Sequence, residues 1–188
     1  DCYNLEKITI NNLYTKNIRD LSHLFENCYS LKTLEISNEL FITSNVTLLN
    51  NMFTNCKALE KLDLNTKDFN SVKNISKIFF GCEKLTNLNM GNFDTSKVTN
   101  MDYMFYKCSS LSSLDLSMFN TNNVQSMQFI FNYCTNLTKI NLVKFNTINC
   151  DNFNAAFSGV SNIYIIINKE KNEQLLEKIY GDYTIVDK

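Results

Sequence analysis

The sequence predicts an α/β solenoid, a stack of similar units that each contain one strand and one short helix. Cysteines recur at a nearly constant spacing, and the same apolar pattern recurs between them. A period of about 20–50 residues indicates stacked repeats, because one such unit cannot bury its own apolar side. With 188 residues and 44% hydrophobic content, the chain is long enough for one domain with a buried core.

Six of the seven cysteines form one regular series: Cys2, Cys28, Cys56, Cys82, Cys108 and Cys134. Zinc ligands come in close pairs such as C-x2-C, and the sequence has none. Disulfides between neighbouring units are conceivable, but parallel, in-register side chains have poor S–S geometry. We therefore expect buried free thiols, with Cys150 in an apolar slot. Cys2 fits the core series better than the alternative role of a lipid-attachment cysteine.

The first half of each unit predicts a strand. An L-x-x-L-x-L run, as in Leu111, Leu114 and Leu116, ends in alternation of apolar and polar residues. Alternation with period two is typical of a strand with one buried face. Strands of successive units would then form a continuous parallel sheet.

The second half of each unit predicts a short helix. Its V-x-x-M-x-x-M-F-x-x-C pattern spaces Val98, Met101, Met104, Phe105 and Cys108 three and four residues apart, as on one helical side. One phenylalanine per unit is expected in an interior aromatic column: Phe25, Phe53, Phe79, Phe105, Phe131 and Phe157. Two irregularities, two extra residues near Ser37–Ser44 and a shifted Phe69, fall after strands and predict loops.

We place the solenoid at residues 1–167 and a C-terminal cap of the same domain at residues 168–188. The consecutive apolar residues of Ile163–Ile167 predict a strand covered on both faces. A helix over Lys171–Tyr180, stopped by Gly181, and a strand over Tyr183–Val186 would follow. The first unit lacks a preceding helix, so we expect the natural chain to continue upstream. An uncapped end would also permit self-association.

The segment NFDTSKVTNMDYMFYKCSSLSSLDLSMFNTNNVQSM, Asn92–Met127, closely resembles BspA-type leucine-rich repeats, also known as the mycoplasma-lipoprotein type. The shared pattern is F-x-T-x-x-V-x-x-M-x-x-M-F-x-x-C-x-x-L-x-x-L-x-L, and the resemblance extends over about residues 1–167. It implies a leucine-rich-repeat solenoid on a surface protein, and some members are implicated in adhesion to host or matrix proteins. The motifs are structural, so no functional residue carries over.

Outward residues of the strands form the first candidate site. One column would hold Thr9, Glu35, Asp63, Asn89, Asp115 and Asn141, and its neighbour Lys7, Thr33, Lys61, Asn87, Ser113 and Lys139. From these we select Lys61, Asp63, Asn89, Asp115 and Asn141 as candidate partner-binding residues. The alternative is a solvated face that keeps the sheet from aggregating. Binding of a cation by the acidic residues of the first column is a third possibility, but the column offers few of the oxygen ligands that calcium needs.

Aromatic residues form the second candidate site. Phe80, Tyr106 and Tyr133 lie one or two positions before a cysteine of the series, where the apolar pattern does not require them. Clusters of exposed Tyr and Phe are typical of protein-binding surfaces. The alternative is that they cover the solenoid edge and pack on adjacent units.

Composition restricts the function. The net charge of −1 argues against a general nucleic-acid binder. The sequence contains no run of 18 apolar residues, so we expect no segment that inserts into a membrane. With one histidine, His23, and no nucleophile, phosphate-loop or metal motif, we expect neither an enzyme nor a bound cofactor or metal. We expect a cell-surface or secreted module that binds a protein of unknown identity. The alternative is a structural spacer or self-associating stalk. The 30 asparagines require many turn or solvated positions.

Overall fold

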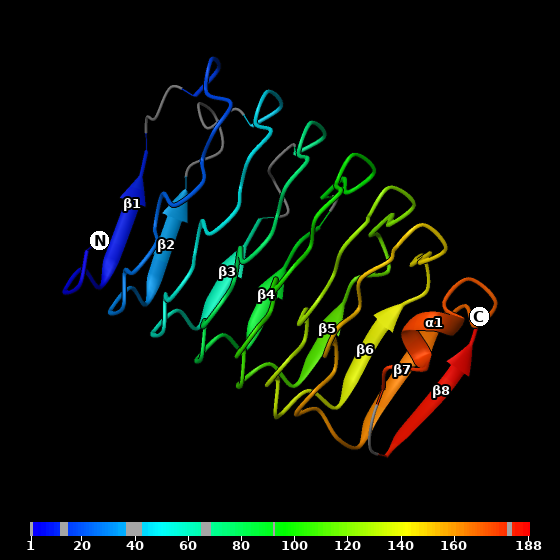
Figure 1. Ribbon diagram of the computed structural model, residues 1–188. Coiled ribbons are helices and arrows are strands. Elements are labelled where there is room, and N and C mark those ends of the chain that lie inside the picture. Colours follow the sequence, from blue (N-terminus) through cyan, green and yellow to red (C-terminus); the bar gives the residue numbers. More distant parts are fainter. Residues whose placement is uncertain (1, 12–14, 37–42, 65–68, 92, 180–181) are drawn as a thin grey trace.

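Parallel strands, one in each coil, form one side of the molecule (Figure 1). The computed structural model describes residues 2–11, 15–36, 43–64, 69–91, 93–179 and 182–188. It shows a parallel β-solenoid of about six coils. Equivalent residues of neighbouring coils are separated by the predicted number of residues along the chain, as Asp63 and Asn89 are. The first six strands are β1 (Lys7–Ile10), β2 (Thr33–Ile36), β3 (Lys61–Asp63), β4 (Asn87–Asn89), β5 (Ser113–Asp115) and β6 (Lys139–Leu142). They are followed by β7 (Ile163–Ile167), helix α1 (Glu173–Leu176) and β8 (Tyr183–Asp187).

The predicted sheet is parallel but not continuous. Its hydrogen-bonded groups are β1–β2, β3–β4 and β5–β6–β7–β8. The interruption between β2 and β3 coincides with the one longer step of the cysteine series, from Cys28 to Cys56. Nothing in the sequence spacing explains the second interruption, between β4 and β5.

The predicted helix in the second half of each unit is wrong. We call this part of each coil the return segment; in the unit of Cys108 it runs over residues 98–108. The N–H groups of Met101, Tyr103, Phe105 and Lys107 donate at 2.9 Å to carbonyls of the next coil. The intervening N–H groups of residues 104, 106 and 108 donate to the carbonyl three residues back. An α-helix would bond each N–H four residues back within the same coil.

Two backbone positions in each return segment explain why it is not helical. Tyr103 and Lys107 have φ angles of 56° and 58°, in the left-handed region that interrupts a right-handed helix. The same conformation recurs in two columns: His23, Asn51, Lys77, Tyr103, Phe129 and Ala155, and Asn27, Asn55, Gly81, Lys107, Tyr133 and Gly159. This turn geometry still brings apolar residues three and four apart to one side, which is the spacing that suggested a helix.

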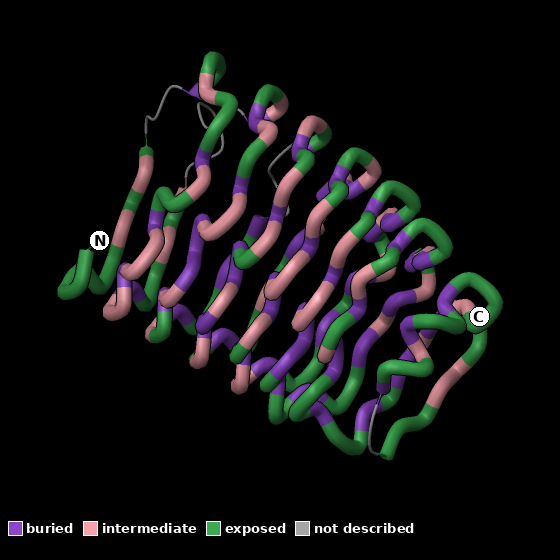
Figure 2. Tube along the Cα trace, in the orientation of Figure 1, coloured by how far each residue is buried: buried purple, intermediate pink, exposed green. Residues whose placement is uncertain are grey.

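The interior follows the repeat as predicted. The rings of the six expected phenylalanines stack from coil to coil, with centroids 5.0–5.8 Å apart. Phe69, Phe93 and Phe119 form a second column, so the shifted Phe69 is part of the core. Buried positions recur along every coil in Figure 2. The predicted loops between these elements fall largely on residues 37–42 and 65–68, outside the described residues.

The cysteine series is a column of free thiols, as predicted. The Sγ atoms of Cys56, Cys82, Cys108 and Cys134 each donate to a phenylalanine carbonyl of the preceding coil at 3.0–3.2 Å. Cys28 and Cys150 are buried as well. Cys2 is exposed, contrary to the core position expected for it, because it lies at the edge of the described stack and contacts a neighbouring coil on one side only.

The C-terminal residues extend the sheet, since β8 pairs in parallel with β7. Contrary to the prediction of cover on both faces, β7 is buried on one face only. Tyr164 is exposed and Ile166 half-buried, because β8 lies at the edge of β7 and not over it. The expected helix over Lys171–Tyr180 is reduced to the single turn of α1, after which residues 178 and 179 make tighter three-residue bonds. The expected stop at Gly181 lies outside the described residues.

Candidate functional site

The sheet places the first candidate site as the spacing predicted. Asp63 lies in register with Asn89, and Asp115 with Asn141, while Lys61 faces Asn87 in the neighbouring column. The interruptions of the sheet separate these pairs from one another, so the columns are not single unbroken arrays.

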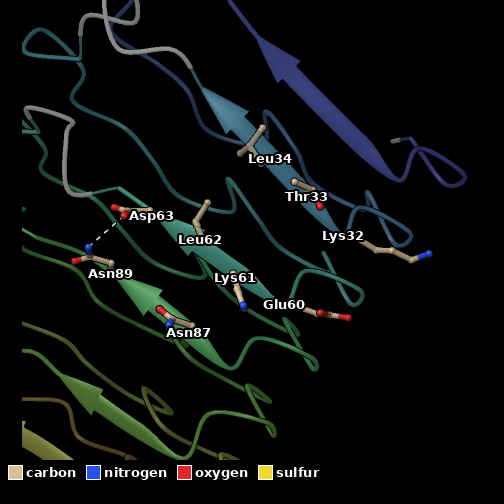
Figure 3. A pocket seen from close by; sticks show the side chains of 9 residues that line it. All are labelled: Lys32, Thr33, Leu34, Glu60, Lys61, Leu62, Asp63, Asn87 and Asn89. Carbon is tan, nitrogen blue, oxygen red and sulfur yellow. Dashed lines mark hydrogen bonds between the residues drawn. The ribbon is translucent and has the colours of Figure 1, made fainter.

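Most of these side chains bond to groups of their own chain. The side-chain oxygens of Asn89, Asp115 and Asn141 each accept a hydrogen bond from the N–H two residues later, at 3.0, 2.9 and 3.3 Å. Asn89 also donates to Asp63 at 3.3 Å (Figure 3). These Asx-turn bonds end the strands and turn the chain. Such contacts favour the solvated-face interpretation for this column.

Polar side chains of β1 and β2 also bond to one another. Lys7 pairs with Glu35 at 2.7 Å, and Thr9 donates to the same carboxylate at 3.1 Å. Together these two contacts lower the pKa of the Glu35 carboxyl, with the Lys7 contact the larger cause. The Glu35 carboxylate is therefore already partnered on both sides.

A shallow open groove lies on the sheet where β2 and β3 are not bonded to each other. Its walls come from β2, β3 and β4 and carry charges of both signs, among them Lys32, Glu60, Lys61 and Asp63 (Figure 3). Lys32 is paired with Glu6 at 2.9 Å. The groove thus offers polar groups of mixed charge but no concentrated field of one sign.

Asx turns account for part of the asparagine content. A second column of Asx turns lies at the isolated bridges between return segments. Its acceptor side chains are Asp20, Asn74, Asn100 and Asn152. A third column contains Asp94, Asn120 and Asn146. Short polar side chains that bond to the backbone two residues later suit tight turns, so a chain with three turns per coil needs them repeatedly.

The second candidate site becomes a larger cluster in the structure. Phe80 stacks on Tyr106 with ring centroids 4.7 Å apart, and Tyr106 meets Tyr133 edge-on at 5.7 Å. Tyr103 joins Tyr106 at 5.7 Å and stacks on Phe129 at 4.7 Å. We call these five rings, which span three coils, the aromatic patch. Tyr133 is 49% exposed and the other four are half-buried, so the patch is open to solvent.

Two lysines lie against the aromatic patch. The Nζ atom of Lys77 is 5.5 Å from the centroid of Tyr103, and that of Lys107 is 5.6 Å from the centroid of Tyr106. Both distances fit cation–π contacts. The patch therefore combines apolar ring area with positive charge at its border.

Sequence reasoning found three of these rings and missed Tyr103 and Phe129. Both lie in the first left-handed column of the return segments, so their rings project beside those of the neighbouring coil. On the predicted helix they belonged to no apolar stripe. The sequence did contain one signal that these segments form left-handed turns and not helices. Asparagine or glycine occupies four of the six positions of the second left-handed column, Asn27, Asn55, Gly81 and Gly159.

The buried cysteine thiols are unreactive near neutral pH. Burial raises the pKa of the Cys56 and Cys134 thiols to about 12 and that of Cys150 to about 11. Because the thiolate is the nucleophile and the metal ligand, these groups are inert near neutral pH. In the described part of the chain, no three His, Cys, Asp or Glu residues gather in a way that would hold a metal ion. No helix among those same residues is long and apolar enough to cross a membrane.

Comparison with known proteins identifies the family of the chain. No curated protein matches the chain. A family model described as "Mycoplasma protein of unknown function, DUF285" matches residues 1–88 and again residues 49–170, as a repeated chain allows. The two matches together cover residues 1–170 of 188. The chain therefore belongs to the DUF285 family of mycoplasma proteins of unknown function.

Proposed function

We propose that this chain is a non-enzymatic binding module of a cell-surface or secreted protein, and that it recognises another protein through the aromatic patch. One observation carries the proposal: five aromatic rings, contributed by three coils, form one solvent-accessible cluster. The interior already has its own phenylalanine columns, so these rings are additional to what the core requires. Partly exposed Tyr and Phe clusters are typical of binding hot spots.

The repeat pattern supports the same proposal from the sequence side. We infer that the coils are BspA-type leucine-rich repeats, because the F-x-T, V-x-x-M and M-F-x-x-C elements recur at the expected spacing. That resemblance implies a surface location and, for some members, adhesion to host or matrix proteins. The partner's identity does not follow from it.

The test is capture by the immobilised chain from serum and extracellular-matrix proteins, with identification of what binds. The double variant Tyr106→Ser/Tyr133→Ser removes two patch rings, and Tyr164→Ser/Tyr183→Ser removes two exposed tyrosines of the sheet as a matched control. We expect a partner that is lost with the first variant and retained by the second. Loss with the control alone would move the site to the sheet and contradict the proposal. Circular dichroism and thermal melting of both variants confirm that they fold.

A structural spacer is the second candidate function. The observation that favours it is the self-sufficiency of the sheet, whose Asx turns and ion pairs satisfy one another. Sedimentation of the purified chain separates the two candidates. Association with its own copies, without capture of any other protein, would support the spacer and remove the binding proposal.

A further inference from the structure

The border of the aromatic patch carries positive charge without a carboxylate partner. Lys77 and Lys107 are exposed and lie over Tyr103 and Tyr106. Across the described residues, the ion pairs of this chain involve Lys7, His23, Lys32 and Lys57, and neither patch lysine takes part in one. Each ammonium thus retains donors for a partner group.

The acidic residue beside Tyr103 in the sequence, Asp102, forms no ion pair with either lysine among the described residues. Asp102, adjacent to Tyr103, accepts a hydrogen bond from Ser126 Oγ at 2.5 Å and two from Gln128, one from its backbone N–H and one from its Nε2, both at 3.1 Å. Its carboxylate is therefore engaged within the coil stack. Asp102 keeps its negative charge, but its oxygens bond to Ser126 and Gln128, and Lys77 and Lys107 remain available to carboxylates of a partner.

From this combination we infer that the aromatic patch takes an acidic protein segment with apolar side chains, whose carboxylates pair with Lys77 and Lys107. The inference rests on the proposed function and specifies the partner's chemistry. Apolar or aromatic side chains would cover the rings, while carboxylates at either side would meet the ammonium groups. A basic segment would meet like charge, and a neutral segment would leave the two ammonium groups unpaired.

The experiment uses fluorescein-labelled twelve-residue peptides and fluorescence anisotropy. The first peptide alternates Glu or Asp with Leu or Phe, the second has Gln and Asn in place of the acids, the third has Lys, and the fourth keeps the acids with Ser in place of the apolar residues. We expect the first peptide to bind at least tenfold more tightly than each of the others. Its affinity should fall by about tenfold or more between 50 and 300 mM NaCl, as salt screens the lysine–carboxylate pairs.

Charge-reversal variants locate the effect. Lys77→Glu/Lys107→Glu should lower the affinity for the first peptide at least tenfold. Lys144→Glu/Lys169→Glu, which makes the same charge change at exposed lysines elsewhere, should leave it within twofold. Equal losses in both variants, or equal binding of the neutral or basic peptide, would overturn the inference. If all peptides fail while the captured protein is still lost with Tyr106→Ser/Tyr133→Ser, the binding function stands and only the acidic partner class is wrong.

Discussion

The strand side and the return segments of this solenoid share one interior and differ on the outside. On the strand side, outward Asp, Asn, Lys and Glu residues bond to one another or to nearby backbone groups. On the return segments, aromatic side chains gather between Phe80 and Tyr133 and leave ring area accessible. The stack is maintained by the repeated interior, so outward positions of single coils are free to differ. Recognition is therefore expected where the outside departs from the repeat.

The largest expected difference is between an interior ring and a patch ring. Phe105→Ala should lower the free energy of unfolding by about 3–5 kcal/mol, because it empties a fully buried site in the middle of the phenylalanine column. Tyr133→Ser should cost less than about 1 kcal/mol, since that ring is half exposed. Urea denaturation measures both. A Tyr133→Ser loss as large as that of Phe105→Ala would make the patch a part of the core.

Alkaline pH should weaken the interior through its thiols. Burial raises the pKa of Cys134 to about 12, whereas an unfolded thiol titrates near 9. Above pH 9 the unfolded chain loses this proton and the folded chain keeps it, so stability falls as pH rises towards 12. At pH 10.5 one such thiol accounts for about 2 kcal/mol. Comparing urea midpoints at pH 7.5 and 10.5 for the natural chain and Cys134→Val measures this, and the variant should lose less. Equal losses would mean that Cys134 titrates normally.

The left-handed positions test why the return segments are not helices. Gly81 has φ +70°, and a Cβ there would lie 2.7 Å from Asn55 Oδ1. Gly81→Ala should therefore destabilise the chain by about 1–2 kcal/mol. Lys107→Gly, in the same column, removes a Cβ from a left-handed residue and should leave stability unchanged or slightly raised. Thermal unfolding of the pair measures the contrast, and stabilisation by Gly81→Ala would contradict the turn geometry.

The smallest effect is expected on the strand side. Asp115→Ala removes the 2.9 Å bond from the Ser117 N–H and should cost about 0.5–1.5 kcal/mol. Asp115→Asn keeps an acceptor and should cost only a few tenths. In the capture experiment neither change should affect the partner. A partner lost with both Asp115→Ala and Asp115→Asn would instead show that this carboxylate takes part in recognition.

The interior was predictable because it repeats, and the backbone of the return segments was not. The phenylalanine and cysteine positions recur once in each unit, so their burial in columns follows from spacing alone. The V-x-x-M-x-x-M-F spacing fits both a helix and a series of turns that bond to the next coil. What decides between them is the bonding between coils, which a single unit's pattern does not contain. For the same reason Phe80, Tyr106 and Tyr133 were identified, while Tyr103 and Phe129 were missed.

The direction of the hydrogen bonds between coils has a mechanical consequence. These bonds run from one coil to the next, roughly along the stacking axis, in the strands and in the return segments alike. Tension along that axis would load one coil interface at a time, so the coils would separate from the stack one after another. Each coil released would lengthen the chain by about 85 Å, since the residues of one unit extend to about 90 Å and a stacked coil spans about 4.8 Å. Pulled from its ends, such a molecule would yield in equal steps and would limit the force transmitted to whatever it holds.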